Sequence, residues 1–122
     1  MPTPRSLVPM AHVASVPRSV VFYRQLGFEL VKDFTPEDAS EPAWAMLASG
    51  DVRLMVTLAS EPVVARAQAV LFYLYFDDVP ALHAELVAAG LNPGPITYPF
   101  YCPKGEFPLT DSDGYCLMLT HT

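Results

Sequence analysis

The stretch SVPRSVVFYRQLGF, residues 15–28, has the form of a short helix with a marked beginning and end. The Ser15 side chain can accept a hydrogen bond from a free backbone N–H group of the first turn. Pro17 falls in that turn, where a missing N–H group costs little. Gly27 suits the left-handed conformation in which many helices end. The stretch therefore predicts one helix that ends at Gly27.

The same pattern occurs a second time in DVPALHAELVAAGL, residues 78–91. Ser15 and Asp78 are 63 residues apart, and so are Gly27 and Gly90. A repeat at this spacing in a chain of 122 residues predicts two similar supersecondary modules.

The segments around both helices have the pattern of strands. Apolar and β-branched residues run through 7–14 and 69–76 before the helices and through 28–34 after the first one. Residues 43–58 and 106–120 each resemble a hairpin, with turns at 49–51 and 112–114. We therefore predict a single α+β domain of two β-α-β-β-β modules, 1–59 and 69–122, joined by a linker at 60–68.

Composition limits the class of protein. Apolar residues make up 52% of the chain, which is enough for a folded core. The net charge of −6, with seven basic residues, argues against a nucleic-acid partner. No apolar run reaches the roughly 18 residues of a membrane helix, and the N-terminus lacks a signal-peptide pattern. We expect a cytoplasmic protein without a membrane partner, in which Cys102 and Cys116 are reduced thiols.

The repeat, the helix end FYRQLGF and the hairpin DSDGYCL together resemble the vicinal oxygen chelate superfamily. This superfamily includes glyoxalase I, extradiol dioxygenases, fosfomycin-modifying enzymes and the bleomycin-resistance binding proteins. The resemblance covers residues 7–120. It implies two modules whose sheets curl into a cup, usually completed in a homodimer, and in the enzymes a divalent metal inside the cup.

The metal-ligand positions of the superfamily carry over to apolar residues, namely Val8, Met55, Leu71 and Met118. None of these side chains offers the oxygen or imidazole donor that a hard or borderline divalent ion requires. We therefore expect no metal, no cofactor and no catalytic residue. The chain is most similar to the metal-free, bleomycin-resistance-like binding members.

Alternation of side chains along the strands predicts which residues line the cup. One face of each strand is aliphatic or phenylalanine, and the other mixes methionine, tyrosine, histidine, arginine and threonine, as small-molecule pockets do. With neighbouring aromatic positions added, the predicted ligand-binding residues are Met10, His12, Trp44, Met46, Arg53, Met55, Tyr73, Tyr75, Tyr101, Phe107 and Met118.

Several of these residues have a simpler interpretation. His12 and Trp44 can be core residues, Tyr73 and Tyr75 can serve a dimer interface, and Arg53 can point to solvent. Outside the set, we expect His83 to be exposed on the second helix. We expect Asp111 and Asp113 to form a turn, because aspartate side chains accept hydrogen bonds from nearby backbone groups.

Three functions follow from this pattern. The first is a protein that sequesters an aromatic or amphipathic compound such as an antibiotic, and the acidic charge is compatible with a cationic one. The second is a metal-dependent lyase, isomerase or dioxygenase of the same superfamily with relocated ligands, His12 among them. The third is a structural or regulatory dimer whose cup is filled by its own methionines. We favour the first.

Overall fold

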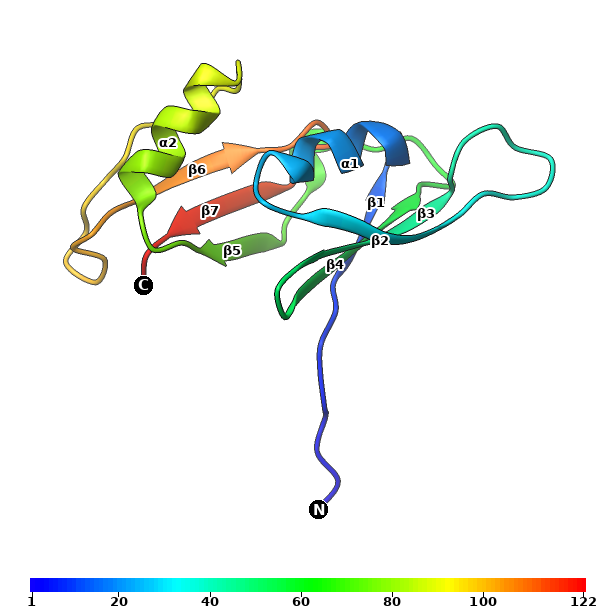
Figure 1. Cartoon of the computed structure of the whole chain (residues 1–122), viewed down its shortest axis with the longest axis horizontal. Coiled ribbons are helices and arrows are strands. Elements are labelled where there is room, and N and C mark those ends of the chain that lie inside the picture. The colour runs from blue at the N-terminus through cyan, green and yellow to red at the C-terminus, as the bar shows by residue number, and fades with distance from the viewer. The chain divides into compact units, whose positions relative to one another are not determined.

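A computed structural model describes all residues from Met1 to Thr122 and divides the chain into two compact units, Met1–Val63 and Val64–Thr122. Each unit contains one sheet and one α-helix, so the chain has the predicted α+β fold (Figure 1). The elements of the first unit are β1 (Met10–Val13), α1 (Val16–Arg24), β2 (Glu29–Phe34), β3 (Trp44–Ser49) and β4 (Val52–Leu58). Those of the second are the 3-10 helix η1 (Ala65–Ala67), β5 (Leu71–Tyr75), α2 (Val79–Ala88), β6 (Glu106–Thr110) and β7 (Cys116–Thr120).

Both helices begin and end where the sequence predicts. The Ser15 hydroxyl and the Asp78 carboxylate each accept a hydrogen bond from the backbone N–H three residues on, at 3.3 and 3.0 Å. Gly27 and Gly90 follow the helices with φ angles of 93° and 88°, which only glycine adopts without strain. The repeated motif thus forms the same capped helix twice.

The sheet of the first unit has four strands in the order β1-β4-β3-β2. β1 runs parallel to β4, and the other neighbours are antiparallel. The predicted hairpin at 43–58 is confirmed as β3 and β4, with Gly50 at the turn. On one face of this sheet, small and aliphatic side chains are buried with residues of α1, and this core contains Ala11, Val13, Val16, Val20, Tyr23, Ala45, Leu47, Leu54 and Val56.

The sheet of the second unit has three strands in the order β5-β7-β6. Its parallel pair repeats the register of the first unit, because Tyr73 lies beside Met118 as Met10 lies beside Met55. The prediction of a β-α-β-β-β pattern is wrong for this module, which has only two strands after its helix. The segment between α2 and β6 contains four prolines, which lack the N–H group that a strand ladder requires, and it forms one isolated bridge, Thr97 with Glu106.

The turn between β6 and β7 is built as predicted around Asp111. One of its carboxylate oxygens accepts hydrogen bonds from the backbone N–H groups of Asp113 and Tyr115, both at 2.9 Å. This is the local bonding by which aspartate stabilises turns. The Asp111 side chain is therefore a structural part of the hairpin, to which Asp113 contributes its backbone N–H group.

Part of the segment predicted as a linker belongs to the second unit. Residues 64–68 include the 3-10 helix, whose Ala65 lies against the β6–β7 turn. A Cβ atom on Gly114 would come within 2.5 Å of the Ala65 Cα atom. The Gln68 side-chain amide donates to the Asp113 carbonyl at 3.3 Å. These contacts fix the 3-10 helix on the turn.

Candidate functional site

Three methionines lie side by side on the face of the first sheet that is not packed against α1. Met10 on β1 is opposite Met55 on β4, which is opposite Met46 on β3. Met10 is 46% exposed, and Met46 and Met55 are half-buried. We call these three residues the methionine row. Because thioether side chains adapt their shape to irregular partners, this row forms a soft apolar surface.

A second row on the same face carries the aromatic and imidazole groups. His12 is opposite Thr57, which is opposite Trp44, and Phe34 on β2 lies next to Trp44. His12 and Phe34 are exposed, whereas Trp44 and Thr57 are half-buried. The structure therefore brings five predicted residues of the first module, His12, Trp44 and the methionine row, onto one uncovered face.

Arg53 is held at the end of this sheet. Its guanidinium donates hydrogen bonds to the carbonyls of Gly50 at 2.6 Å and Val52 at 3.0 Å. Gly50 lies in the turn between β3 and β4, and Val52 is the first residue of β4. The charge of Arg53 is thus fixed at the hairpin turn.

The uncovered face of the second sheet is richer in tyrosine. Tyr73 lies beside Met118, with Pro108 on the other side of Met118. In the next row, Tyr75 lies beside Thr120, with Glu106 beyond it. Tyr73 and Tyr75 are 46% and 65% exposed, whereas Glu106 and Thr120 are buried. The predicted residues Tyr73, Tyr75 and Met118 therefore share one face.

Glu106 is a candidate functional residue that the sequence analysis missed. Its side chain is only 3% exposed, the Tyr101 hydroxyl donates to its Oε1 at 3.0 Å, and its Oε2 has no hydrogen-bond partner. The same hydrogen bond and the nearby carboxylate charge raise the pKa of Tyr101. Pro108 on β6 lies opposite Met118, and Glu106, two residues earlier on β6, shares the same face. The sequence does not give this register, because the register depends on the length of the turn between β6 and β7.

The prediction that Phe107 lines the ligand site is wrong in this structure. Phe107 is fully buried and pairs with Leu119, on the opposite face from Glu106. Its ring contacts the His83 imidazole edge to face, with centroids 4.8 Å apart. His83 is consequently half-buried rather than exposed, and its Nε2 lies 2.9 Å from the Gly94 carbonyl oxygen. Phe107 and Leu109 of β6 are buried on the side of α2, and this contact with Phe107 buries part of the His83 ring.

Neither cysteine takes part in a disulfide in the structure. Cys102 is fully buried, and its Sγ lies 3.2 Å from the Thr120 hydroxyl and 3.2 Å from the Gly105 carbonyl oxygen. The hydrogen bond with Thr120 lowers the pKa of the Cys102 thiol to about 7, against the effect of burial. Cys102 thus belongs to the polar cluster of Glu106, Tyr101 and Thr120 at one end of the second sheet.

The residues at the metal positions of the resemblance do not fit a divalent ion. Val8 precedes β1, Leu71 lies beside Cys116, and Met55 and Met118 present thioethers. Magnesium, manganese, iron and zinc require oxygen or imidazole ligands here, and nowhere in the chain do three or more His, Cys, Asp or Glu side chains gather in a metal-binding arrangement.

No helix has the length and apolar character needed to cross a membrane.

Comparison with known proteins identifies the family of this chain. The Glyoxalase/Bleomycin resistance protein/Dioxygenase superfamily matches residues 9–119. The chain belongs to this superfamily. A search of curated proteins finds no match for this chain.

Solved structures share the fold of this superfamily member over nearly its whole length. A bleomycin resistance determinant encoded on the transposon Tn5 has a TM-score of 0.76 and 20% identity, covering 98% of both chains. TnmS3, an antibiotic binding protein from a Streptomyces species, has a TM-score of 0.74 and 19% identity, covering 99% of this chain and 98% of its own. The bleomycin-binding protein from bleomycin-producing Streptomyces verticillus, complexed with copper(II)-bleomycin, has a TM-score of 0.69 and 23% identity, covering 100% and 99%.

Proposed function

We propose that this protein is a metal-free small-molecule-binding protein that sequesters an aromatic or amphipathic compound such as an antibiotic. The observation that carries the proposal is the composition of the uncovered sheet faces, where the methionine row and Trp44 lie on one sheet and Tyr73, Tyr75 and Met118 on the other. Methionine and aromatic side chains supply adaptable apolar contact area, and Tyr hydroxyls add polar contacts that orient a ligand. The antibiotic-binding proteins that share the fold support the same function.

The charge of the protein favours a cationic compound. The net charge is −6, so the protein attracts cations at long range. Glu106 adds a carboxylate to the face that carries Tyr75, with Tyr101 bonded to it. The proposed ligand contacts are Met10, His12, Trp44, Met46 and Met55 in the first unit, with Arg53 at the edge of its sheet, and Tyr73, Tyr75, Tyr101 and Met118 in the second unit.

We also propose that the protein acts in the cytoplasm as a homodimer. The edge strand β5 exposes Leu71, Tyr73 and Tyr75 in alternate positions, with exposed fractions of 54%, 46% and 65%. An edge strand with a row of large apolar side chains favours contact with another chain or a ligand. A second copy of the protein would cover this row without requiring a different partner.

A fluorescence titration tests the proposed ligand site, because Trp44 is the only tryptophan. Metal-free bleomycin and a panel of cationic aromatic antibiotics are titrated into the protein. We expect a saturable change in Trp44 emission with at least one of these compounds, since the indole lies beside the methionine row.

Two matched lysine variants locate that binding. Met10→Lys places a positive charge in the methionine row, and Val87→Lys places it at a similarly exposed position on α2. Met10→Lys should weaken binding at least tenfold, and Val87→Lys should leave it unchanged. Absence of saturable binding across the panel, or equal affinity in both variants, would exclude the proposed site.

A further inference from the structure

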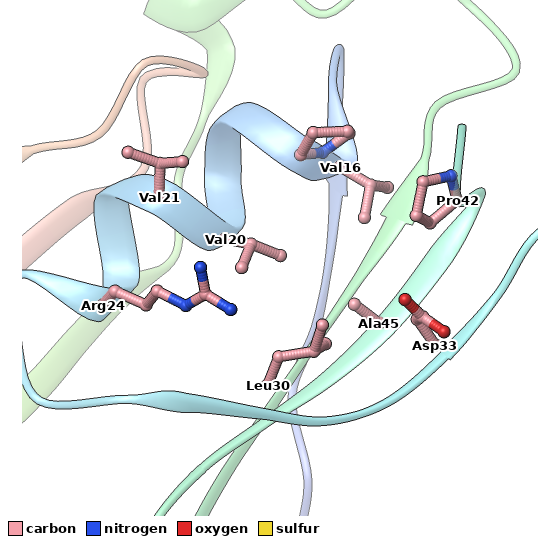
Figure 2. A pocket seen from close by; sticks show the side chains of 9 residues that line it. Val16, Val20, Val21, Arg24, Leu30, Asp33, Pro42 and Ala45 are labelled. Atoms are coloured by element: carbon pink, nitrogen blue, oxygen red, sulfur yellow. The ribbon is translucent and has the colours of Figure 1, made fainter. Parts of the chain in front are cut away.

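A pocket opens in the first unit between α1 and the edge of the sheet (Figure 2). Its volume is about 270 Å³. Apolar side chains form most of its wall, and two charged residues complete it: Val16, Pro17, Val20, Val21, Leu30, Pro42 and Ala45, with Arg24 and Asp33. Ala45 alternates with Met46 along β3, so the pocket lies on the opposite face of the sheet from the methionine row.

The pocket exists because α1 does not fully cover the edge strand β2. Leu30 and Asp33 are opposite Leu47 and Ala45, which are fully buried. A β-bulge between Leu30 and Lys32 shifts the register here, and Leu30 stays only half-buried. The pocket therefore lies between α1 and the stretch of the edge strand where the register shifts.

The two charged residues of the pocket are not paired. Arg24 lies in the last turn of α1, where a cation is favoured by the helix dipole, and Asp33 lies on β2. Neither side chain forms a hydrogen bond or an ion pair in the structure, and Figure 2 shows them on opposite sides of the apolar wall. A cation and an anion thus flank one small apolar surface, each with its polar atoms available to a ligand.

We propose that this pocket binds a small zwitterionic amphiphile of the ω-amino acid type. Its carboxylate would meet the Arg24 guanidinium, whose planar fork matches a carboxylate, and its ammonium group would meet Asp33. An aliphatic chain between the two groups would cover Val20 and Leu30. The volume of 270 Å³ restricts the ligand to a small molecule. This site is separate from the proposed antibiotic site.

The test is a titration of isotope-labelled protein followed by amide NMR shifts. The probes are 6-aminohexanoate, hexanoate and hexylamine, which share a six-carbon chain and differ in their charged ends. We expect 6-aminohexanoate to shift amides around Val20, Arg24 and Asp33 saturably. Each singly charged probe should bind about fivefold more weakly, as expected for one exposed ion pair. No saturable shift with any probe, or one affinity for all three, would overturn the proposal.

Charge-neutral variants assign each end of the ligand. Arg24→Gln should weaken 6-aminohexanoate about fivefold and leave hexylamine unchanged, and Asp33→Asn should weaken it similarly and leave hexanoate unchanged. Both residues are exposed, so the fold should persist, and the amide spectrum reports it directly. Arg66→Gln, on the exposed 3-10 helix, is the control and should leave the affinities of all three probes unchanged. Variants that bind all three probes like the unmodified protein would contradict the assignment.

Discussion

Gly114 occupies a position that no other residue can fill without disturbing the second unit. Its φ angle is 88°, and a Cβ atom there would lie 2.5 Å from both the Cα and the carbonyl oxygen of Ala65. We expect Gly114→Ala to lower the free energy of unfolding by about 2–4 kcal/mol, because left-handed strain and a backbone clash add together. Urea denaturation measures this change.

Gly50 provides the matched control for that substitution. It has a φ angle of 56°, and a Cβ atom there would meet nothing within 4 Å. Gly50→Ala should therefore cost only about 1 kcal/mol, the strain term alone. Equal losses in the two variants would show that the 3-10 helix does not rest on the β6–β7 turn.

We expect Cys102 to make the free energy of unfolding depend on pH. Its thiol has a pKa of about 7 in the folded chain, lowered from 9.0 by the hydrogen bond with Thr120. The unfolded chain therefore binds more protons between pH 7 and pH 9, so the free energy of unfolding should rise with pH across this window and lose that contribution as pH falls through 7. Urea denaturation at several pH values should show a steeper rise for the unmodified protein than for Cys102→Ala.

Cys116→Ala serves as the control for the pH series. Cys116 is half-buried, and its Sγ approaches only the Leu117 carbonyl oxygen, at 4.0 Å. This variant should keep the slope of the unmodified protein. Parallel pH profiles for the unmodified protein and Cys102→Ala would contradict the role of the Thr120 hydrogen bond.

The capped helix is the element that the sequence specifies most completely. The Asp78 carboxylate accepts a hydrogen bond from the Ala81 N–H at 3.0 Å at the start of α2. Asp78→Ala should lower the free energy of unfolding by about 1 kcal/mol, because one N–H group of the first turn loses its partner. Thermal unfolding compares this variant with Asp77→Ala, a neighbouring exposed aspartate outside the helix. A larger loss in Asp77→Ala would be inconsistent with the assigned cap.

Elements with local signals could be predicted, and those that depend on distant register could not. The helix caps, the glycines that end the helices and the two hairpin turns depend on residues that are neighbours in the sequence. The structure contains all of these features. The register of β6 depends on the turn that joins it to β7, so the sequence does not show that Phe107 faces the core while Glu106 shares the face of Met118. Four prolines before β6 break the repeat, because the segment that contains them forms no strand in the second unit.

The candidate site follows the same division. Alternation along the strands predicted that Met10 shares a face with Met55 and that Tyr73 shares a face with Met118. The structure confirms both pairs, and the second pair repeats the first at the spacing of 63 residues. The pocket beside α1 could not be predicted, since its walls come from α1, β2, β3 and the loop before β3, whose packing is not visible in the sequence pattern.

The whole protein combines an acidic surface with uncovered apolar sheet faces. The net charge is −6, and Met10, Leu71, Tyr73 and Tyr75 are exposed in the single chain. Exposed apolar area of this kind is commonly covered by a ligand or a second chain. The proposed homodimer that binds a small molecule accounts for both features.

Native mass spectrometry of freshly purified protein, with and without added metal-free bleomycin, tests the proposed function most directly. It reports the oligomeric state, bound metal and bound organic mass in one spectrum. We expect a dimer without metal that carries an organic ligand, either co-purified or added. A dimer with one divalent ion per site would contradict the proposal, because Val8, Met55, Leu71 and Met118 would then not define the metal positions.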